Sequence, residues 1–231
     1  MHPDRPDGRV LYPQARLQQL GCKAVTGKAA KLLCSAGAVL ALTSAAQADP
    51  TFPARYEVRG VAATDALNIR ATPSARAEII GEIEPFAIHI EVLDLSPDRK
   101  WGKIGVPEGN GWVSMAYLAP TPPEDPFTVP RPLSCLGTEP FWSVSLYPRG
   151  AEYNSPDTGA VPMAVTHEAV ADHGYLVQLE EGPSLNRTLI ITREACSDGM
   201  SDRAYGFATR MFTEAPDGNS ALHGCCTLDH R

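Results

Sequence analysis

Short alternations of apolar and polar residues, separated by turn-forming residues, run through the first half of the chain after residue 54. They read YEVRGV, LNIRA, EIIGEI, AIHIEVLDL, WGKIGV and GWVSM. In LNIR, Leu67 and Ile69 face one side of a strand, and Asn68 and Arg70 face the other. Pro73 lacks the backbone donor that a central strand needs, so this strand ends in a turn. The pattern predicts a small all-β barrel.

The second half of the chain continues this short, turn-punctuated pattern with FWSVSLY, AVPMAVT, YLVQLE, TLIITR, YGFATRMF and SALHGCC. Between the halves lies APTPPEDPFTVPRP, residues 119–132, which holds six prolines and no hydrophobic periodicity. Such a segment is typical of an extended, semi-rigid connector. We therefore expect an all-β protein with one barrel over residues 49–120, a Pro-rich linker over 121–132 and a second, barrel-like domain over 133–231.

The first 48 residues are typical of a secretory signal peptide. Three lysines precede the apolar run LLCSAGAVLALTSA, and the tripeptide Ala46-Gln47-Ala48 follows it. The run is shorter than the ~20 apolar residues of a transmembrane helix. We expect cleavage after Ala48 and a soluble product, periplasmic or secreted, without a membrane partner. The polar residues before Lys23 exceed what a signal needs, so a translation start near Val25 is a further hypothesis.

Charge narrows the range of partners. Loss of residues 1–48 would remove six of the 20 basic and two of the 27 acidic side chains, which leaves a formal charge of −11. Such a surface repels the phosphates of nucleic acids and of anionic lipids. Cationic proteins and peptides remain as partners, and we expect the protein itself to be a monomer.

Four cysteines lie in the expected exported chain: Cys135, Cys196, Cys225 and Cys226. An even number in an oxidising compartment predicts two disulfides, so the second domain is expected to be disulfide-stapled. The adjacent Cys225 and Cys226 fit disulfide geometry poorly, so each should bond to Cys135 or Cys196, in either pairing. The alternative is a zinc site with His223. We favour disulfides because exported thiols are usually oxidised, and we expect no metal or other cofactor.

The ordered set LNIRATPS, IIGEIEP, WGKIGV and GWVSMAYL resembles the bacterial SH3-like domain of envelope proteins, over residues ~55–119. Pro85-Phe86 departs from that family, which usually has a glycine before the next strand. The resemblance implies an SH3-like barrel that acts as a binding module. Several relatives are linked to cell-wall peptides or to peptidase and amidase partners. Aromatic side chains at the loops of such barrels line a shallow groove.

The groove candidates in this chain are Tyr56, Arg70, Trp101, Trp112 and Tyr117. Core packing is the alternative for each ring, because a barrel this small needs large side chains to fill it. We assign Trp112 to the core, since Gly111 and Val113 place it inside a short strand. Trp101 follows an exposed turn and fits either place. Arg70 is expected at an exposed or rim position, in a structural hydrogen bond in preference to ligand contact.

The segments CLGTEPFWSVSL, CSDGMSDRAYGF and HGCC resemble an uncharacterised family of small bacterial envelope proteins and lipoproteins, over residues ~133–231. The resemblance implies Cys196–Cys225 as the common disulfide and Cys135–Cys226 as an added one. It carries no established activity. The motif candidates at matching positions are Glu139, Trp142, Asp198, Ser201 and Asp202.

Two of these features could bind a ligand. Glu139, beside Phe141 and Trp142, would need a partner if it is partly buried, and Arg203 or backbone amides of the SDGMSD loop could supply one. The loop itself, residues 197–202, crowds Asp and Ser side chains that could hold a cation. We favour the alternative, in which those side chains hydrogen-bond the backbone and shape a long turn.

Catalytic motifs are missing from the sequence. HEAVADH, residues 167–173, separates its histidines by six residues instead of the four of zinc peptidases. There is no G-x-S-x-G, no glycine-rich phosphate loop and no cysteine expected to stay reduced. We expect no enzyme, no catalytic residue and no metal. The first hypothesis is a binding or scaffolding protein that recognises cell-wall peptide or an envelope protein. The alternatives are an inhibitor of a cationic, lysozyme-type wall hydrolase and a hydrolase with an unrecognised site.

Overall fold

The computed structural model describes residues 51–121 and 127–231. The expected signal peptide and residues 122–126 of the proline-rich stretch lie outside the described residues. Within them, strands joined by turns make up the fold, with one short 3-10 helix, η1 (Met115–Tyr117), and no α-helix. The all-β prediction is therefore confirmed. No helix of the described part of the chain is long and apolar enough to span a membrane.

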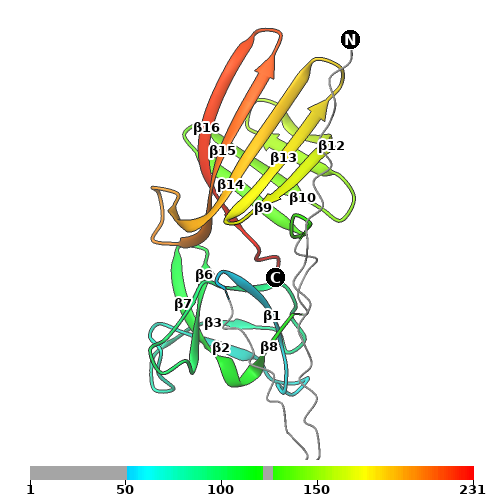
Figure 1. Ribbon diagram of the computed structural model, residues 1–231. Coiled ribbons are helices and arrows are strands. Elements are labelled where there is room, and N and C mark those ends of the chain that lie inside the picture. Colours follow the sequence, from blue (N-terminus) through cyan, green and yellow to red (C-terminus); the bar gives the residue numbers. More distant parts are fainter. Residues whose placement is uncertain (1–50, 122–126) are drawn as a thin grey trace, which may run out of the picture. The chain divides into compact units, whose positions relative to one another are not determined.

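The first half of the described chain builds a small barrel from two antiparallel sheets (Figure 1). One sheet has the order β4-β1-β8 and the other the order β3-β2-β7-β6-β5. The strands are β1 (Ala54–Val58), β2 (Leu67–Arg70), β3 (Ile79–Ile83), β4 (Ile90–Val92), β5 (Asp94–Leu95), β6 (Trp101–Val106), β7 (Gly109–Ser114) and β8 (Leu118–Pro120).

Alternate residues of these strands fill the space between the two sheets. Leu67 and Ile69 of β2 are 4% exposed, whereas Asn68 and Arg70 are half-buried on the opposite face. The same period-2 pattern buries Val113 of β7 completely. The core of this barrel comprises Tyr56, Val58, Leu67, Ile69, Ile83, Ile90, Val92, Ile104, Val113 and Leu118.

The second half of the described chain forms a closed barrel of eight antiparallel strands. Each strand pairs with the next along the chain, and β9 closes the barrel because it pairs with both β10 and β16. Figure 1 shows β13 to β16 as long neighbouring strands. The strands are β9 (Leu133–Thr138), β10 (Phe141–Leu146), β11 (Ala151–Ser155), β12 (Gly159–Ala171), β13 (Gly174–Glu181), β14 (Leu185–Ser197), β15 (Ala204–Ala215) and β16 (Gly218–Thr227).

Inward-facing side chains fill this closed barrel with an apolar core that is distinct from that of the first barrel. Trp142 of β10 is 3% exposed and needs space that two glycines provide. A Cβ on Gly137 would lie 2.1 Å from the Trp142 Nε1 atom, and one on Gly224 would lie 2.9 Å from its Cζ2. The three residues therefore form one packing unit, in which only glycine leaves room for the indole.

Both disulfides lie on this second barrel. Cys135–Cys226 joins two directly paired residues of β9 and β16, at the seam where the barrel closes. Cys196–Cys225 connects β14 with β16 across the intervening strand β15. These are the pairs that the resemblance to envelope proteins implies. The two disulfides thus fix the end of β16 to two other strands.

Ala48–Arg231 forms one compact unit, and polar contacts join the two barrels within it. The guanidinium of Arg55 on β1 is buried and donates to the carbonyl oxygens of Arg131, Pro132 and Leu228. The side-chain amide of Asn110 on β7 donates to the Asp202 carbonyl at 2.7 Å. It also accepts from the Ala204 N–H at 2.9 Å. Such a two-point contact holds one barrel's strand end against the other barrel's loop.

The last residues of the proline-rich stretch, 129–132, contact the folded barrels. Val129 is 2% exposed and belongs to the core cluster of the second barrel. The Arg131 side chain pairs with Glu168. At least residues 129–132 are therefore packed against the fold, and they do not act as a simple spacer. The domain boundaries themselves stay a prediction.

Candidate functional site

The outer face of the five-stranded sheet presents most of the groove candidates. Arg70 of β2 pairs across the sheet with Trp112 of β7, and Trp112 pairs with Lys103 of β6. In the next row, Ser114 of β7 pairs with Trp101 of β6. Paired residues point to the same face of a sheet, so these side chains form two adjacent rows.

A groove with a volume of about 490 Å³ lies over one part of this face. Its floor contains Asn68, Arg70, Ser114 and Trp101 from strands β2, β7 and β6. The connection between β1 and β2 supplies one wall, and the ring of Tyr117 supplies another side. The full lining is Gly60, Val61, Ala62, Asp65, Ala66, Leu67, Asn68, Arg70, Ala75, Trp101, Ser114 and Tyr117.

Local contacts hold the polar side of the groove in place. The Arg70 Nη1 atom donates to the Ala77 carbonyl at 2.7 Å, as the sequence led us to expect. Tyr117 ends the short 3-10 helix, and its carbonyl accepts from the Arg59 N–H at 2.8 Å. The Asp65 carboxylate accepts from the Ala66 N–H at 2.8 Å. The groove therefore combines two aromatic rings with one positive and one negative side chain on anchored backbone.

This combination suits an extended polar ligand with some apolar surface. Aromatic rings offer flat contact area to peptide or sugar at a low cost in conformational entropy. Asn68 and Ser114 add hydrogen-bonding groups, and a guanidinium can pair with a carboxylate or carbonyl oxygen. Lined in this way, the groove is equipped for binding.

Three of the five candidates meet in the groove, and two do not. Arg70, Trp101 and Tyr117 line it. Tyr56 is 5% exposed and belongs to the barrel core, where burial raises the pKa of its phenol. We expected Trp112 in the core, but it is half-buried on the outer face, next to Arg70. The physical reason is the strand period, since Gly111 and Val113 occupy the inward positions on either side of it.

Several lining residues had not been singled out from the sequence. Asn68 and Ser114 follow from strand alternation, because they share a face with Arg70 and Trp112 respectively. The loop residues Gly60 to Ala62 and Asp65 carry no such signal. Their position depends on how the connection between β1 and β2 folds over the sheet.

The two candidates of the GTEPFW motif in the second barrel lie in different environments. Glu139 is exposed in the turn between β9 and β10, so it needs no buried partner. Trp142 is a core residue. Arg203, the proposed partner of Glu139, lies instead 3.9 Å from Asp229 and over the Tyr205 ring.

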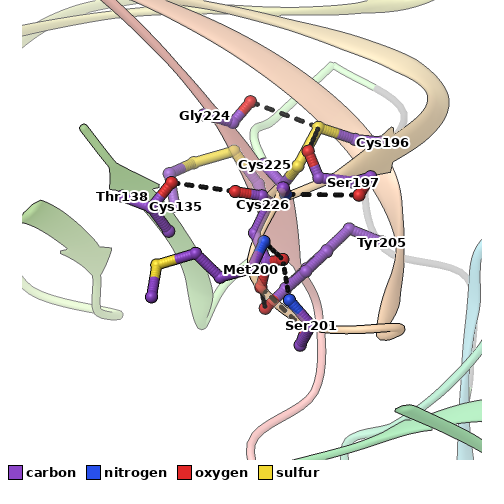
Figure 2. Close-up of a disulfide and its surroundings, with 12 residues drawn as sticks. Cys135, Thr138, Cys196, Ser197, Met200, Ser201, Tyr205, Gly224, Cys225 and Cys226 are labelled. Carbon is purple, nitrogen blue, oxygen red and sulfur yellow. Dashed lines mark hydrogen bonds between the residues drawn. A yellow bond between two sulfur atoms is a disulfide. The ribbon is translucent and has the colours of Figure 1, made fainter. Parts of the chain in front are cut away.

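The SDGMSD loop is a turn shaped by its own side chains. Figure 2 shows Ser197, Met200 and Ser201 of this loop with their hydrogen bonds. Asp198 accepts from the Met200 and Ser201 N–H groups at 3.0 and 2.9 Å and from the Ser201 hydroxyl at 3.0 Å. The Tyr205 hydroxyl adds a fourth donor at 3.2 Å. Burial acts to raise the pKa of Asp198, but these hydrogen bonds outweigh it and lower the pKa.

The remaining loop candidates are used in the same structural way. The Ser201 hydroxyl accepts from the Arg203 N–H at 3.2 Å, and the exposed Asp202 offers its carbonyl to Asn110. The Thr138 hydroxyl donates to the Asp198 carbonyl at 2.8 Å and ties the loop to β9 (Figure 2). Across residues 51–121 and 127–231, His, Cys, Asp and Glu side chains form no cluster of three suited to a metal ion.

Comparison with known proteins agrees with the architecture of the first barrel. The family model for the bacterial SH3 domain matches residues 65–119, which contain the groove face of β2, β6 and β7. No curated protein matches the chain, and no solved structure does. The resemblance of residues 133–231 to envelope proteins therefore stays a prediction.

The match also bears on the general role of the chain. A bacterial SH3 domain suggests binding of protein or peptide related to the cell wall. Together with two disulfides, it is consistent with an extracytoplasmic protein. Residues 65–119 of this chain form a bacterial SH3 domain.

Proposed function

We propose that this protein is an exported, periplasmic binding or scaffolding protein whose SH3 domain recognises cell-wall peptide, or an envelope protein, in the groove of β2, β6 and β7. The observation that carries the proposal is the lining of that groove. The side chains that line its space of about 490 Å³ include Trp101 and Tyr117 together with Arg70, Asn68 and Ser114. A cell-wall peptide offers what this lining can engage, namely amide planes for the rings and carboxylates for the guanidinium.

The role of the second barrel in this proposal is structural. Its interior is filled by packed side chains, and its motif residues serve the fold. Its contacts with Arg55 and Asn110 hold the SH3 domain and the second barrel in one compact unit. We propose binding without catalysis, with the second barrel as the rigid support of the groove.

Retention by purified peptidoglycan sacculi tests the proposal. Residues 49–231 are incubated with sacculi, sedimented and quantified, in parallel with the Trp101→Ala variant. We expect retention of the wild-type chain and loss of about tenfold in affinity for the variant, as for a central aromatic contact. Absence of retention for the wild-type chain would exclude wall peptide as the ligand and leave an envelope protein.

A second candidate rests on charge. With a formal charge of −11, residues 49–231 could block a cationic wall hydrolase of the lysozyme type. Inhibition of lysozyme that weakens with added salt would favour this candidate. Inhibition that Trp101→Ala leaves unchanged would separate it from recognition by the groove.

A further inference from the structure

Strand β3 is an edge strand of the five-stranded sheet, whose order is β3-β2-β7-β6-β5. It pairs with β2 on one side. Among the described residues, no strand pairs with its other side. An edge strand directs the N–H and C=O groups of alternate residues away from its sheet, where a further strand can bind them.

The side chains of this edge are unusually apolar for an exposed position. Ile79 is 48% exposed and Ile80 is 43% exposed, and Phe86 just beyond the strand is 72% exposed. The pairing of β3 with β2 shifts register between Ile69 and Arg70, which leaves Ile80 as the extra residue of a bulge. A bulge interrupts regular pairing along an edge. We therefore expect an added strand to pair regularly with the residues after the bulge, Gly81 to Glu84.

Acidic side chains flank the same stretch. Glu78, Glu82 and Glu84 are all exposed. On the outer face, Ile79 pairs with Arg70, and Arg70 pairs with Trp112. The edge therefore lies next to the row of side chains that contains Arg70. The edge thus offers backbone donors and acceptors, two isoleucine side chains and three carboxylates within seven consecutive residues.

We propose that the free edge of β3 binds an extended segment of another protein that alternates lysine or arginine with apolar residues. The segment adds one antiparallel or parallel strand to the sheet, its cations face Glu82 and Glu84 on the outer face, and its apolar side chains lie on the opposite face beside Ile80. This surface is separate from the groove, so the inference goes beyond the proposed function. A second copy of this chain is the wrong partner, because pairing of two β3 edges would bring six like charges together.

The test uses a probe of defined chemistry on residues 49–231. A fluorescein-labelled peptide of about eight residues, alternating lysine and valine, matches the length of one strand. We expect it to bind at low salt, with affinity that falls as salt screens the carboxylates. The double variant Glu82→Lys/Glu84→Lys should weaken binding at least about tenfold. The matched control is Glu180→Lys/Glu214→Lys, two exposed residues on the second barrel with the same change of charge, which should weaken it far less.

Two N-methylated peptides supply a measurement that needs no variant of the protein. Only alternate N–H groups of an added strand face β3, so methylation of one alternate set should abolish binding and methylation of the other should not. Hydrogen exchange at residues 78–84 should slow in the complex. The proposal is overturned if the unmodified peptide does not bind, if both methylated peptides bind equally, or if the two double variants lose affinity equally.

Discussion

The Thr227 hydroxyl donates to a carboxylate oxygen of Glu91 at 2.5 Å, across the contact between the two barrels. The Leu228 N–H donates to the other oxygen at 3.0 Å. Glu91 lies on β4 between two fully buried residues and is itself 3% exposed. Burial, the largest influence, raises the pKa of this carboxyl to about 7 despite the two hydrogen bonds. The contact between the barrels therefore contains a group that titrates near neutral pH.

Stability should depend on the protonation of Glu91. The pKa is higher in the folded chain, about 7, than the ordinary value of 4.5, so the folded chain holds this proton more tightly. The resulting stabilisation is complete below pH 4.5 and is lost as pH rises to about 7. We expect the free energy of unfolding of the wild-type chain, relative to the Glu91→Gln variant, to decrease over this range. Urea unfolding at a series of pH values measures it.

The comparison with Glu91→Gln removes the pH-dependent contribution of His230 to stability. Burial, the largest influence, lowers the pKa of His230 below 6.5, so its contribution to stability increases with pH up to that value. This contribution is present in both proteins and cancels in the difference. A difference in unfolding free energy that stays constant from pH 4.5 to 7 would show that Glu91 does not titrate in this range.

The hydrogen bonds of Arg55 should contribute to the free energy of unfolding beyond the effect of its charge. Its guanidinium donates to three carbonyl oxygens at the contact between the barrels. Arg55→Met leaves these acceptors without that donor, and each buried unsatisfied group costs about 1–3 kcal/mol. We expect a loss of at least about 2 kcal/mol in the free energy of unfolding. Arg59→Met is the control, because the Arg59 side chain is 66% exposed. Similar losses for both variants would contradict this role of Arg55.

Gly111 should tolerate no side chain, although its neighbour in β7 should. A Cβ on Gly111 would lie 2.2 Å from the Ile69 Cγ2 atom, so Gly111→Ala forces the core to shift. Overpacking of this kind costs about 1–3 kcal/mol. The nearest atom to a Cβ on Gly109 is 3.9 Å away, so Gly109→Ala should change the free energy of unfolding far less. Thermal unfolding of the two variants measures this difference. Equal melting temperatures would refute the packing argument.

The two disulfides should contribute unequally. Cys135–Cys226 spans 91 residues and Cys196–Cys225 spans 29. Loop-closure entropy makes the longer link worth about 1 kcal/mol more. Cys135→Ala/Cys226→Ala should therefore lower stability further than Cys196→Ala/Cys225→Ala, in chemical denaturation under non-reducing conditions. The opposite order would mean that native packing around Cys196 outweighs the entropy of the unfolded chain.

Strand periodicity predicted the fold and part of the groove. The alternation in LNIR placed Leu67 and Ile69 in the core and Arg70 on the outer face, and the structure agrees. The same rule, applied to Gly111, Trp112 and Val113, would have placed Trp112 outside the core. The core prediction for Trp112 was wrong because a position inside a short strand does not decide which face the side chain takes. Gly111 faces inward, where a Cβ would lie 2.2 Å from the Ile69 Cγ2 atom, so Trp112 faces outward.

Long-range contacts explain what the sequence did not predict. Glu91 and Thr227 are 136 residues apart, and nothing near Glu91 in the sequence indicates that a distant segment buries it. The same holds for Arg55, whose carbonyl partners lie 76 to 173 residues away. The loop that closes the groove is also placed by tertiary structure. Its residues Gly60 to Ala62 show no periodicity of their own.

A matched pair of tyrosines tests the central claim most directly. Tyr117 lines the groove and is 44% exposed, whereas Tyr147 is 39% exposed on the second barrel. We would measure the affinity of residues 49–231 for purified sacculi with Tyr117→Ala and with Tyr147→Ala. The groove account predicts a loss of about tenfold for Tyr117→Ala and none for Tyr147→Ala. Equal affinities of the two variants would contradict recognition of the wall by this groove.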